Sequence, residues 1–278
     1  MIQGPASLPD QPTLQRARGT GRVVVDAQDG RTRLARLYQD GCAKIRLPRD
    51  DRACGLEAVL INSAGGLTDG DRLSWRAEAG AGARLTLSTQ ACEKVYRARQ
   101  GGRAEIATVL ALGEGASLDW LPQETILFDG GALMRRLDAD LATGARLLAV
   151  EAVVLGRTAM DETVRHGALA DRWRIRCEGR LVFADDLRLD GPIAEAAAKA
   201  PILAGARAFA SLLLVAEGAE RFLPAVRAVL GASGGASAFD GKLFARVTAP
   251  DGFALRQALL PALEALRDGA PLPRVWRT

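Results

Sequence analysis

The chain has 278 residues, with 37 Lys and Arg against 33 Asp and Glu, for a formal net charge of +4. Acidic residues are interspersed with the basic ones, so there is no basic stripe of the kind that binds nucleic acid. One histidine excludes a His-rich metal site. Four cysteines without a CxxC pair, an N-terminus unlike a signal peptide and no membrane-length apolar run predict a cytoplasmic protein with reduced thiols.

The N-terminal part of the chain changes character near residue 19. Residues 1–18 are rich in Pro and Gln, which predicts a flexible arm, and residues 19–278 are expected to form a single domain. Asp29 and Gly30 are a hairpin turn signal between two alternating runs. Four strands are therefore expected first, at 21–26, 32–38, 43–47 and 58–61.

A glycine-rich segment at 62–71 invites a phosphate-loop interpretation. It has no Lys-Ser/Thr after its glycines, and the following residues alternate like a strand instead of opening a helix. A tight turn that needs positive φ at Gly65, Gly66 or Gly70 is the favoured interpretation. Asp71 is a candidate functional residue at this turn.

The segment 84–97 begins as a strand, because Leu85 and Leu87 alternate with polar residues. If that period continues, Glu93 falls on the apolar face, where a carboxylate is costly unless it is paired or hydrogen-bonded. The alternative is a strand that turns out into solvent after Ser88.

A degenerate repeat organises the middle of the chain. Gly82, Gly115 and Gly144 open similar motifs at spacings of 33 and 29 residues. Each glycine turn joins two strand-like runs: 72–79 and 85–88, 104–112 and 118–121, and 135–141 and 147–155. A lone hairpin cannot bury its apolar face, whereas stacked copies can. The sequence therefore predicts a mainly β fold of stacked strands in a β-helix-like arrangement.

Polar residues recur at similar offsets in these repeats. Gln90, Gln123, Glu124 and Glu151 each lie seven to nine residues after the glycine of their own repeat. Stacking would bring them near one another, either on a solvated edge or in an internal polar seam. The large apolar residues around Gln123 and Glu124 favour the internal seam.

The last third contains further strands and the predicted helices. Glu178 and Gly179 signal a hairpin turn, and the apolar run 205–216 is assigned as a strand. Two α-helices are expected, one from about residue 222 and one around the Leu255–Leu266 stripe, where Pro261 should introduce a kink. The end, 272–278, is predicted to be an extended tail.

Two features in this region could suggest chemistry but favour a simpler explanation. His166 sits in a segment typical of an exposed turn, so a hydrolase that uses it is the weakest hypothesis. Asp185, Asp186 and Asp190 could suggest a metal site, but Arg188 lies between them and a surface turn is expected.

Long motifs spread over most of the chain resemble the urease accessory protein family UreD, called UreH in some species. They are NSAGGLTDGDRL at 62–73, LTLSTQACEKVYR at 85–97, LDWLPQETILFD at 118–129, GRTAMDE at 156–162 and LPRVWR at 272–277, with Glu151 and the segment 173–183. The resemblance implies stacked β-strands in a helical arrangement with two helices, in agreement with the repeat.

The resemblance also implies a function and partners. Members of this family are non-catalytic maturation factors that bind UreF directly and the GTPase UreG through the complex. They dock on apo-urease and support nickel delivery to its active site, with a tunnel proposed as the route. No tightly bound cofactor is expected, and Ni²⁺ would pass only transiently.

Three positions depart from the family pattern. Asp69 and Asp161 stand where glycine is common, and Cys92 replaces a more usual alanine. Asp161 is the most disruptive, because its loop demands a positive φ from a residue other than glycine.

Two functional hypotheses follow from the resemblance. In the first, the protein is a scaffold and nickel conduit. In the second, it is a purely structural adaptor between UreF and urease with no ion passage. A path that releases its ion needs weak, scattered ligands. The candidates, either as lining groups or as groups that fix the fold, are Asp71, Thr89, Gln90, Glu93, Gln123, Glu124, Glu151 and Glu162.

Overall fold

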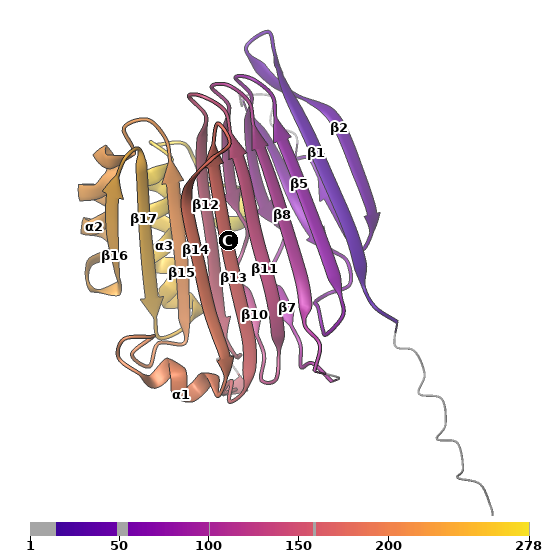
Figure 1. The fold of residues 1–278 in the computed structure, drawn as a ribbon, viewed down its shortest axis with the longest axis vertical. Coiled ribbons are helices and arrows are strands. Elements are labelled where there is room, and N and C mark those ends of the chain that lie inside the picture. Colours follow the sequence, from indigo (N-terminus) through magenta and orange to yellow (C-terminus); the bar gives the residue numbers. More distant parts are fainter. Residues whose placement is uncertain (1–14, 49–54, 100, 158–159, 278) are drawn as a thin grey trace, which may run out of the picture.

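The computed structural model describes residues 15–48, 55–99, 101–157 and 160–277. Two large sheets face each other, and helices cover the outer face of one of them (Figure 1). Sheet A runs in the order β14-β13-β11-β8-β5-β1-β2. Its strands are β1 (Arg18–Gln28), β2 (Arg31–Gly41), β5 (Arg72–Ala79), β8 (Ala104–Leu112), β11 (Ala132–Leu141), β13 (Gly167–Cys177) and β14 (Arg180–Gly191).

Sheet B runs in the order β16-β17-β15-β12-β9-β6-β4-β3, with β10 pairing both β12 and β7 beside this path. Its strands are β3 (Ala43–Arg46), β4 (Leu56–Asn62), β6 (Arg84–Thr89), β7 (Glu93–Val95), β9 (Ser117–Leu121), β10 (Thr125–Leu127), β12 (Arg146–Leu155), β15 (Ala208–Val215), β16 (Gly234–Phe239) and β17 (Lys242–Ala249). The predicted strand 205–216 is confirmed as β15.

The chain passes from sheet A to sheet B and back in about four turns of a β-solenoid. Successive strands pair in parallel: β5, β8 and β11 in sheet A, and β6, β9 and β12 in sheet B. The repeat glycines Gly82, Gly115 and Gly144 have φ of 67°, 62° and 70° and stack at one corner, where the Gly82 amide donates to the Glu114 carbonyl. The predicted β-helix-like arrangement is confirmed.

The strands of one repeat do not form a hairpin, so that detail of the prediction is wrong. In the first repeat, for example, β5 lies in sheet A and β6 in sheet B. The glycine corner turns the chain across to the opposite sheet, where the two apolar faces meet and each strand bonds to the next repeat. Period two defines which side chains face the core, but it does not define the hydrogen-bonding partner.

Two apolar cores result. The first lies between the sheets and includes Leu85, Leu118 and Trp173. The second lies between sheet B and the helices and includes Leu212, Leu259 and Trp276. The inner strands β12 and β15 are buried on both faces because they lie between these two cores, which is why they read as continuous apolar runs.

The helical layer contains the two predicted helices, and a third, short helix lies outside it at the end of β14 (Figure 1). α2 (Leu223–Leu230) has a proline in its first turn, and α3 (Gly252–Leu266) contains Pro261. Asp251 caps α3 by accepting a hydrogen bond from the Ala254 amide at 2.8 Å. The short α1 (Ile193–Ala198) was not predicted. No helix in the described part of the chain is long and apolar enough to cross a membrane.

Two further predictions are wrong for packing reasons. The C-terminal segment is not a free extended tail: Trp276 is fully buried and its indole Nε1 donates to the Leu121 carbonyl at 2.9 Å. Asp185, Asp186 and Asp190 lie within strand β14 and not in a surface turn. At the N-terminus, residues 1–14 of the predicted arm lie outside the described residues, and Arg18 opens β1.

Candidate functional site

The segment 84–97 forms two strands, β6 and β7, with a bend between them. Glu93 and the buried Val95 are two residues apart in β7 and therefore share a face. The half-buried Glu93 carboxylate accepts hydrogen bonds from Asn62 Nδ2 at 3.1 and 3.2 Å and from the Lys94 amide at 3.2 Å. In the described structure no cation pairs with it. Burial raises the pKa of Glu93 to about 7, against the opposing effect of these hydrogen bonds.

Strand pairing places Thr125 beside Glu93. The parallel β7–β10 register joins Glu93 with Thr125, and paired residues in parallel strands point to the same side of the sheet. Thr125 is buried, and its hydroxyl accepts a hydrogen bond from the Arg135 guanidinium at 3.1 Å. Polar groups thus continue through the solenoid interior from Glu93 to Arg135.

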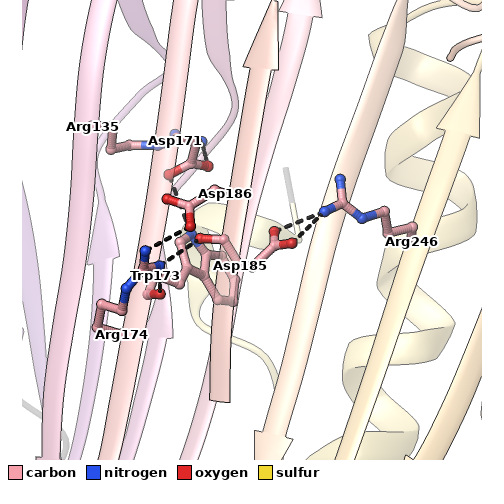
Figure 2. A network of polar contacts seen from close by, with 7 residues as sticks. All are labelled: Arg135, Asp171, Trp173, Arg174, Asp185, Asp186 and Arg246. Carbon is pink, nitrogen blue, oxygen red and sulfur yellow. Dashed lines mark hydrogen bonds and ion pairs between the residues drawn. The ribbon is translucent and has the colours of Figure 1, made fainter. Parts of the chain in front are cut away.

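Arg135 joins the two sheets through Glu151 and contacts a second carboxylate within its own sheet. From β11 in sheet A it contacts Glu151 on β12 of sheet B at 2.5 Å and Asp171 on β13 at 2.6 Å. Each carboxylate also accepts a hydrogen bond from an indole N–H: Trp120 donates to Glu151 at 2.9 Å and Trp173 donates to Asp171 at 3.2 Å. Figure 2 shows Arg135, Asp171 and Trp173 close together. We name as the interior polar column the residues Asn62, Glu93, Thr125, Arg135, Glu151 and Asp171.

Burial and charge oppose each other in this cluster. Burial lowers the pKa of Arg135, but Asp171 and Glu151 outweigh it and the net shift is upward, so the guanidinium stays charged. Burial raises the pKa of Glu151 to about 7; Arg135 acts in the opposite direction, and the negative charge of Asp171 adds to the rise. Burial is thus the main cause of this rise, and because one guanidinium faces two buried carboxylates, it does not cancel the effect.

Gln123 and Glu124 face the helical layer instead of the solenoid interior. Gln123 donates to the Val275 carbonyl at 2.7 Å and accepts a hydrogen bond from Arg256 of α3. Glu124 lies 3.4 Å from Arg256 Nε and accepts a hydrogen bond from Cys92 Sγ at 3.4 Å. These contacts attach the C-terminal segment and α3 to the end of the solenoid repeats.

Two other candidates lie at the corner between β6 and β7. The Thr89 hydroxyl accepts a hydrogen bond from the backbone amide of Gln123 at 2.8 Å and donates to the Ala91 carbonyl at 3.0 Å. Gln90 is exposed, and its amide donates to the Leu60 carbonyl. The structure therefore does not bring Gln90, Glu93 and Glu124 together on one side of the sheet.

Asp71 and Glu162 hold loops in place. Asp71 accepts hydrogen bonds from the Ala17 and Thr68 amides, both at 2.8 Å. Partial burial raises the pKa of Glu162, but Arg157, whose Nε lies 2.8 Å away, and nearby backbone amides lower it by more. Next to it Asp161 adopts φ of 50°, as predicted for this non-glycine position.

Glu162 also lines a surface cleft of about 660 Å³. Tyr96, Arg97, Phe128 and Asp129 are among its walls. The single histidine, His166, is exposed nearby, and its backbone amide donates to Asp129 at 3.2 Å.

Sequence reasoning missed Arg135 and Asp171, although the signal was present. Arg135 lies between the buried Leu133 and Leu137 at period two, and Asp171 precedes the buried Trp173 by two residues. The period-two alternation that placed Glu93 on an apolar face also places the Arg135 and Asp171 side chains on the core-facing side of their strands. Within the described ranges, no three His, Cys, Asp or Glu side chains are grouped so that they could hold a metal ion.

Fold and interior define a class: a two-sheet β-solenoid protein with spaced acidic side chains between its sheets. The chain matches the model of the family described as UreD urease accessory protein over residues 17–277. It therefore belongs to the UreD family, and this membership supports a role in urease maturation.

Similar curated proteins carry the same description. The urease accessory protein UreD of Agrobacterium fabrum (strain C58) is 56% identical over 262 residues, covering 94% of this chain and 92% of that protein. Its namesake in Rhizobium leguminosarum bv. trifolii is 56% identical over 263 residues, with coverage of 94% and 96%. That of Chelativorans sp. is 51% identical over 265 residues, covering 95% of each chain. These relatives are named as accessory proteins and not as enzymes.

Proposed function

We propose that this protein is a cytoplasmic scaffold in a UreD–UreF–UreG complex that docks on apo-urease, and that Ni²⁺ passes at the Glu93 end of its interior polar column. The observation that carries the proposal is the Glu93 carboxylate, which is half-buried and has no cationic partner in the described structure. A buried carboxylate without a counter-ion attracts a cation strongly, since little solvent screens it.

The surroundings of Glu93 suit an ion in transit. The oxygen atoms of Glu93 and Thr125 are hard ligands, and among the described residues three acidic or thiol groups do not converge there to form a tight cage. Conduction needs binding that is favourable enough for entry and weak enough for release. Because the pKa of Glu93 is about 7, uptake of Ni²⁺ at neutral pH displaces a proton that can return when the ion leaves.

The other acidic candidates have structural roles in this proposal. Arg135 occupies the space between Glu151 and Asp171, and its positive charge repels a divalent cation from both. Asp71 and Glu162 are held by backbone amides or by Arg157. Gln123 and Glu124 attach the helical layer.

A purely structural adaptor between UreF and urease, with no ion passage, is the second candidate. It is favoured by the number of candidate polar groups that already have partners within the chain, such as Gln123 and Glu162. In that case the interior polar column only holds the two sheets together.

The substitution Glu93→Gln separates the two candidates, because it keeps the size of the side chain and its hydrogen bond to Asn62 but removes the charge. We expect co-purification with UreF, UreG and apo-urease to be unchanged, and the nickel content of activated urease to fall about tenfold. Glu114→Gln at an exposed solenoid corner is the matched control and should leave nickel content unchanged.

Two outcomes would contradict the conduit. Normal nickel loading with the Glu93→Gln protein would show that no ion depends on this carboxylate. Loss of complex assembly by a normally folded Glu93→Gln protein would favour the structural adaptor.

A further inference from the structure

Strand β2 is an open edge of sheet A. In the described part of the chain it pairs only with β1, and the β1–β2 hairpin projects beyond the neighbouring strands (Figure 1). Ten of its 11 residues are exposed, the exception being the half-buried Thr32. An exposed edge of this length presents a row of main-chain donors and acceptors to any extended segment that approaches it.

The strand register identifies amides that point away from β1. The Cys42 amide donates to the Arg18 carbonyl at 2.9 Å, and bonded and non-bonded residue pairs alternate along an antiparallel ladder. Gly41, Gln39 and Leu37 are therefore in non-bonded pairs, and their N–H groups face the open edge. Leu37 and Tyr38 add apolar surface, with exposed fractions of 37% and 52%.

The charge on this edge has a positive excess, carried by side chains without partners in the described part of the chain. Arg31, Arg33 and Arg36 are exposed, and none of them has an ion pair or side-chain hydrogen bond within the described residues. Asp26 lies across from Arg33 on β1, Asp29 lies in the turn before Arg31, and Asp40 lies near the end of β2. Lys44 lies against the Gly41 carbonyl at 2.8 Å, so four cationic groups stand against three carboxylates. The edge as a whole favours an anionic partner.

The opposite edge of the same sheet has its carboxylates paired. The carboxylates of β14 are paired within the chain: Asp185 with Arg246 at 2.7 Å, Asp186 with Arg174 at 2.6 Å and Asp190 with Arg188 at 2.9 Å. Figure 2 shows the first two of these pairs. On the β14 edge the three carboxylates are thus paired and Arg180 alone has no partner among the described residues, whereas the β2 edge has three such arginines.

We infer that β2 is the docking strand for an extended acidic segment of a partner protein, which adds to sheet A by main-chain hydrogen bonds. Alternate pairing through the amides of Leu37 and Gln39 provides the affinity, and the three arginines select acidic side chains. A second copy of this chain is disfavoured, because it would bring its own arginines against these. The β-bulge between Val24 and Val25 further distorts the register that a copy would have to match.

The inference is tested with the whole chain and a short synthetic peptide of alternating Glu and Val. The acidic peptide should slow amide hydrogen exchange at Leu37 and Gln39, and it should bind about tenfold more tightly than the Lys–Val analogue. The variant R31E/R33E/R36E should reverse this preference. Leu37→Pro removes an outward N–H without removing a bond to β1, so it should abolish protection by either peptide.

A matched control carries the same change in charge elsewhere on sheet A. Arg136, Arg172 and Arg180 are exposed and have no side-chain partner among the described residues, so R136E/R172E/R180E should keep the preference for the acidic peptide. The inference is overturned by equal protection from both peptides, by no protection of β2, or by protection that needs no peptide and rises with protein concentration. None of these outcomes depends on nickel transfer, so the proposed conduit stands or fails separately.

Discussion

The interior polar column has a buried carboxylate towards each end, Glu93 and Glu151, and the two differ in the groups that stabilise them. Glu93 accepts hydrogen bonds from the Asn62 side chain and the Lys94 backbone amide, whereas Glu151 has a guanidinium and an indole N–H against it. Burial raises the pKa of both to about 7. The two sites therefore share the direction of this shift but differ in what surrounds the charge.

This difference shows why pKa alone does not identify a cation site. Around Glu151 a cation is already present and forms part of the fold, so a second one is repelled. Around Glu93 the charge is uncompensated, which costs stability and leaves the carboxylate available. Three substitutions test this contrast, in decreasing order of expected effect.

The largest effect is expected from Arg135→Met, which leaves Glu151 and Asp171 buried without their cation. The free energy of unfolding should fall by about 3–5 kcal/mol, measured by urea denaturation. Adding Glu151→Gln and Asp171→Asn to the same chain should restore most of the loss, because no net charge then stays buried. The exposed neighbour Arg136→Met serves as control and should change stability little. A loss that the added substitutions fail to restore would mean that packing, and not charge, sets the cost.

A pH-dependent effect is expected from Glu93→Gln. The pKa of Glu93 is raised from 4.5 to about 7 in the folded protein, so the folded state holds its proton more tightly than the unfolded state. The stability of the unsubstituted protein should therefore fall as pH rises from about 4.5 to 7. The variant lacks this fall and should be more stable by about 2 kcal/mol at pH 8 but not at pH 4. Thermal unfolding across this range measures it, and equal stability at both pH values would show that Glu93 is compensated in solution.

The smallest effect is expected where the two ends meet, at Thr125. Thr125→Val removes the acceptor of one Arg135 hydrogen bond and should cost about 1 kcal/mol. Thr108 is the matched control: it is buried in β8, and in the described structure its hydroxyl has no hydrogen-bond partner. Thr108→Val should therefore be neutral or slightly stabilising in the same denaturation experiment. Equal losses at both positions would show that Thr125 does not support Arg135.

Sequence periodicity explains how much of this architecture could be predicted. Alternation and the repeat glycines predicted the strands and the stacking, since both depend on local backbone geometry. They did not reveal that consecutive strands lie in opposite sheets, because bonding partners are defined by contacts about thirty residues away.

The candidate site shows the same division. Alternation along the strand predicted that Glu93 shares the apolar face of β7. The offsets from the repeat glycines predicted that Gln123 and Glu124 lie near it, but both residues face the helical layer. Those two residues lie between β9 and β10, where Pro122 interrupts the alternation and a strand phase no longer applies. Burial of Trp276 depends on packing against Leu121, far away in sequence, which no local pattern indicates.

The connection between Arg135, Glu151 and Asp171 has a consequence for folding order. The three residues lie on β11, β12 and β13, which follow one another in the chain. The cluster is therefore complete once the solenoid has added one further turn after β11. Until β13 arrives, Asp171 is in water and Arg135 has only part of its final environment. Addition of that strand is then the step that removes the charges from solvent, and the barrier to unfolding from this end should include the cost of separating them.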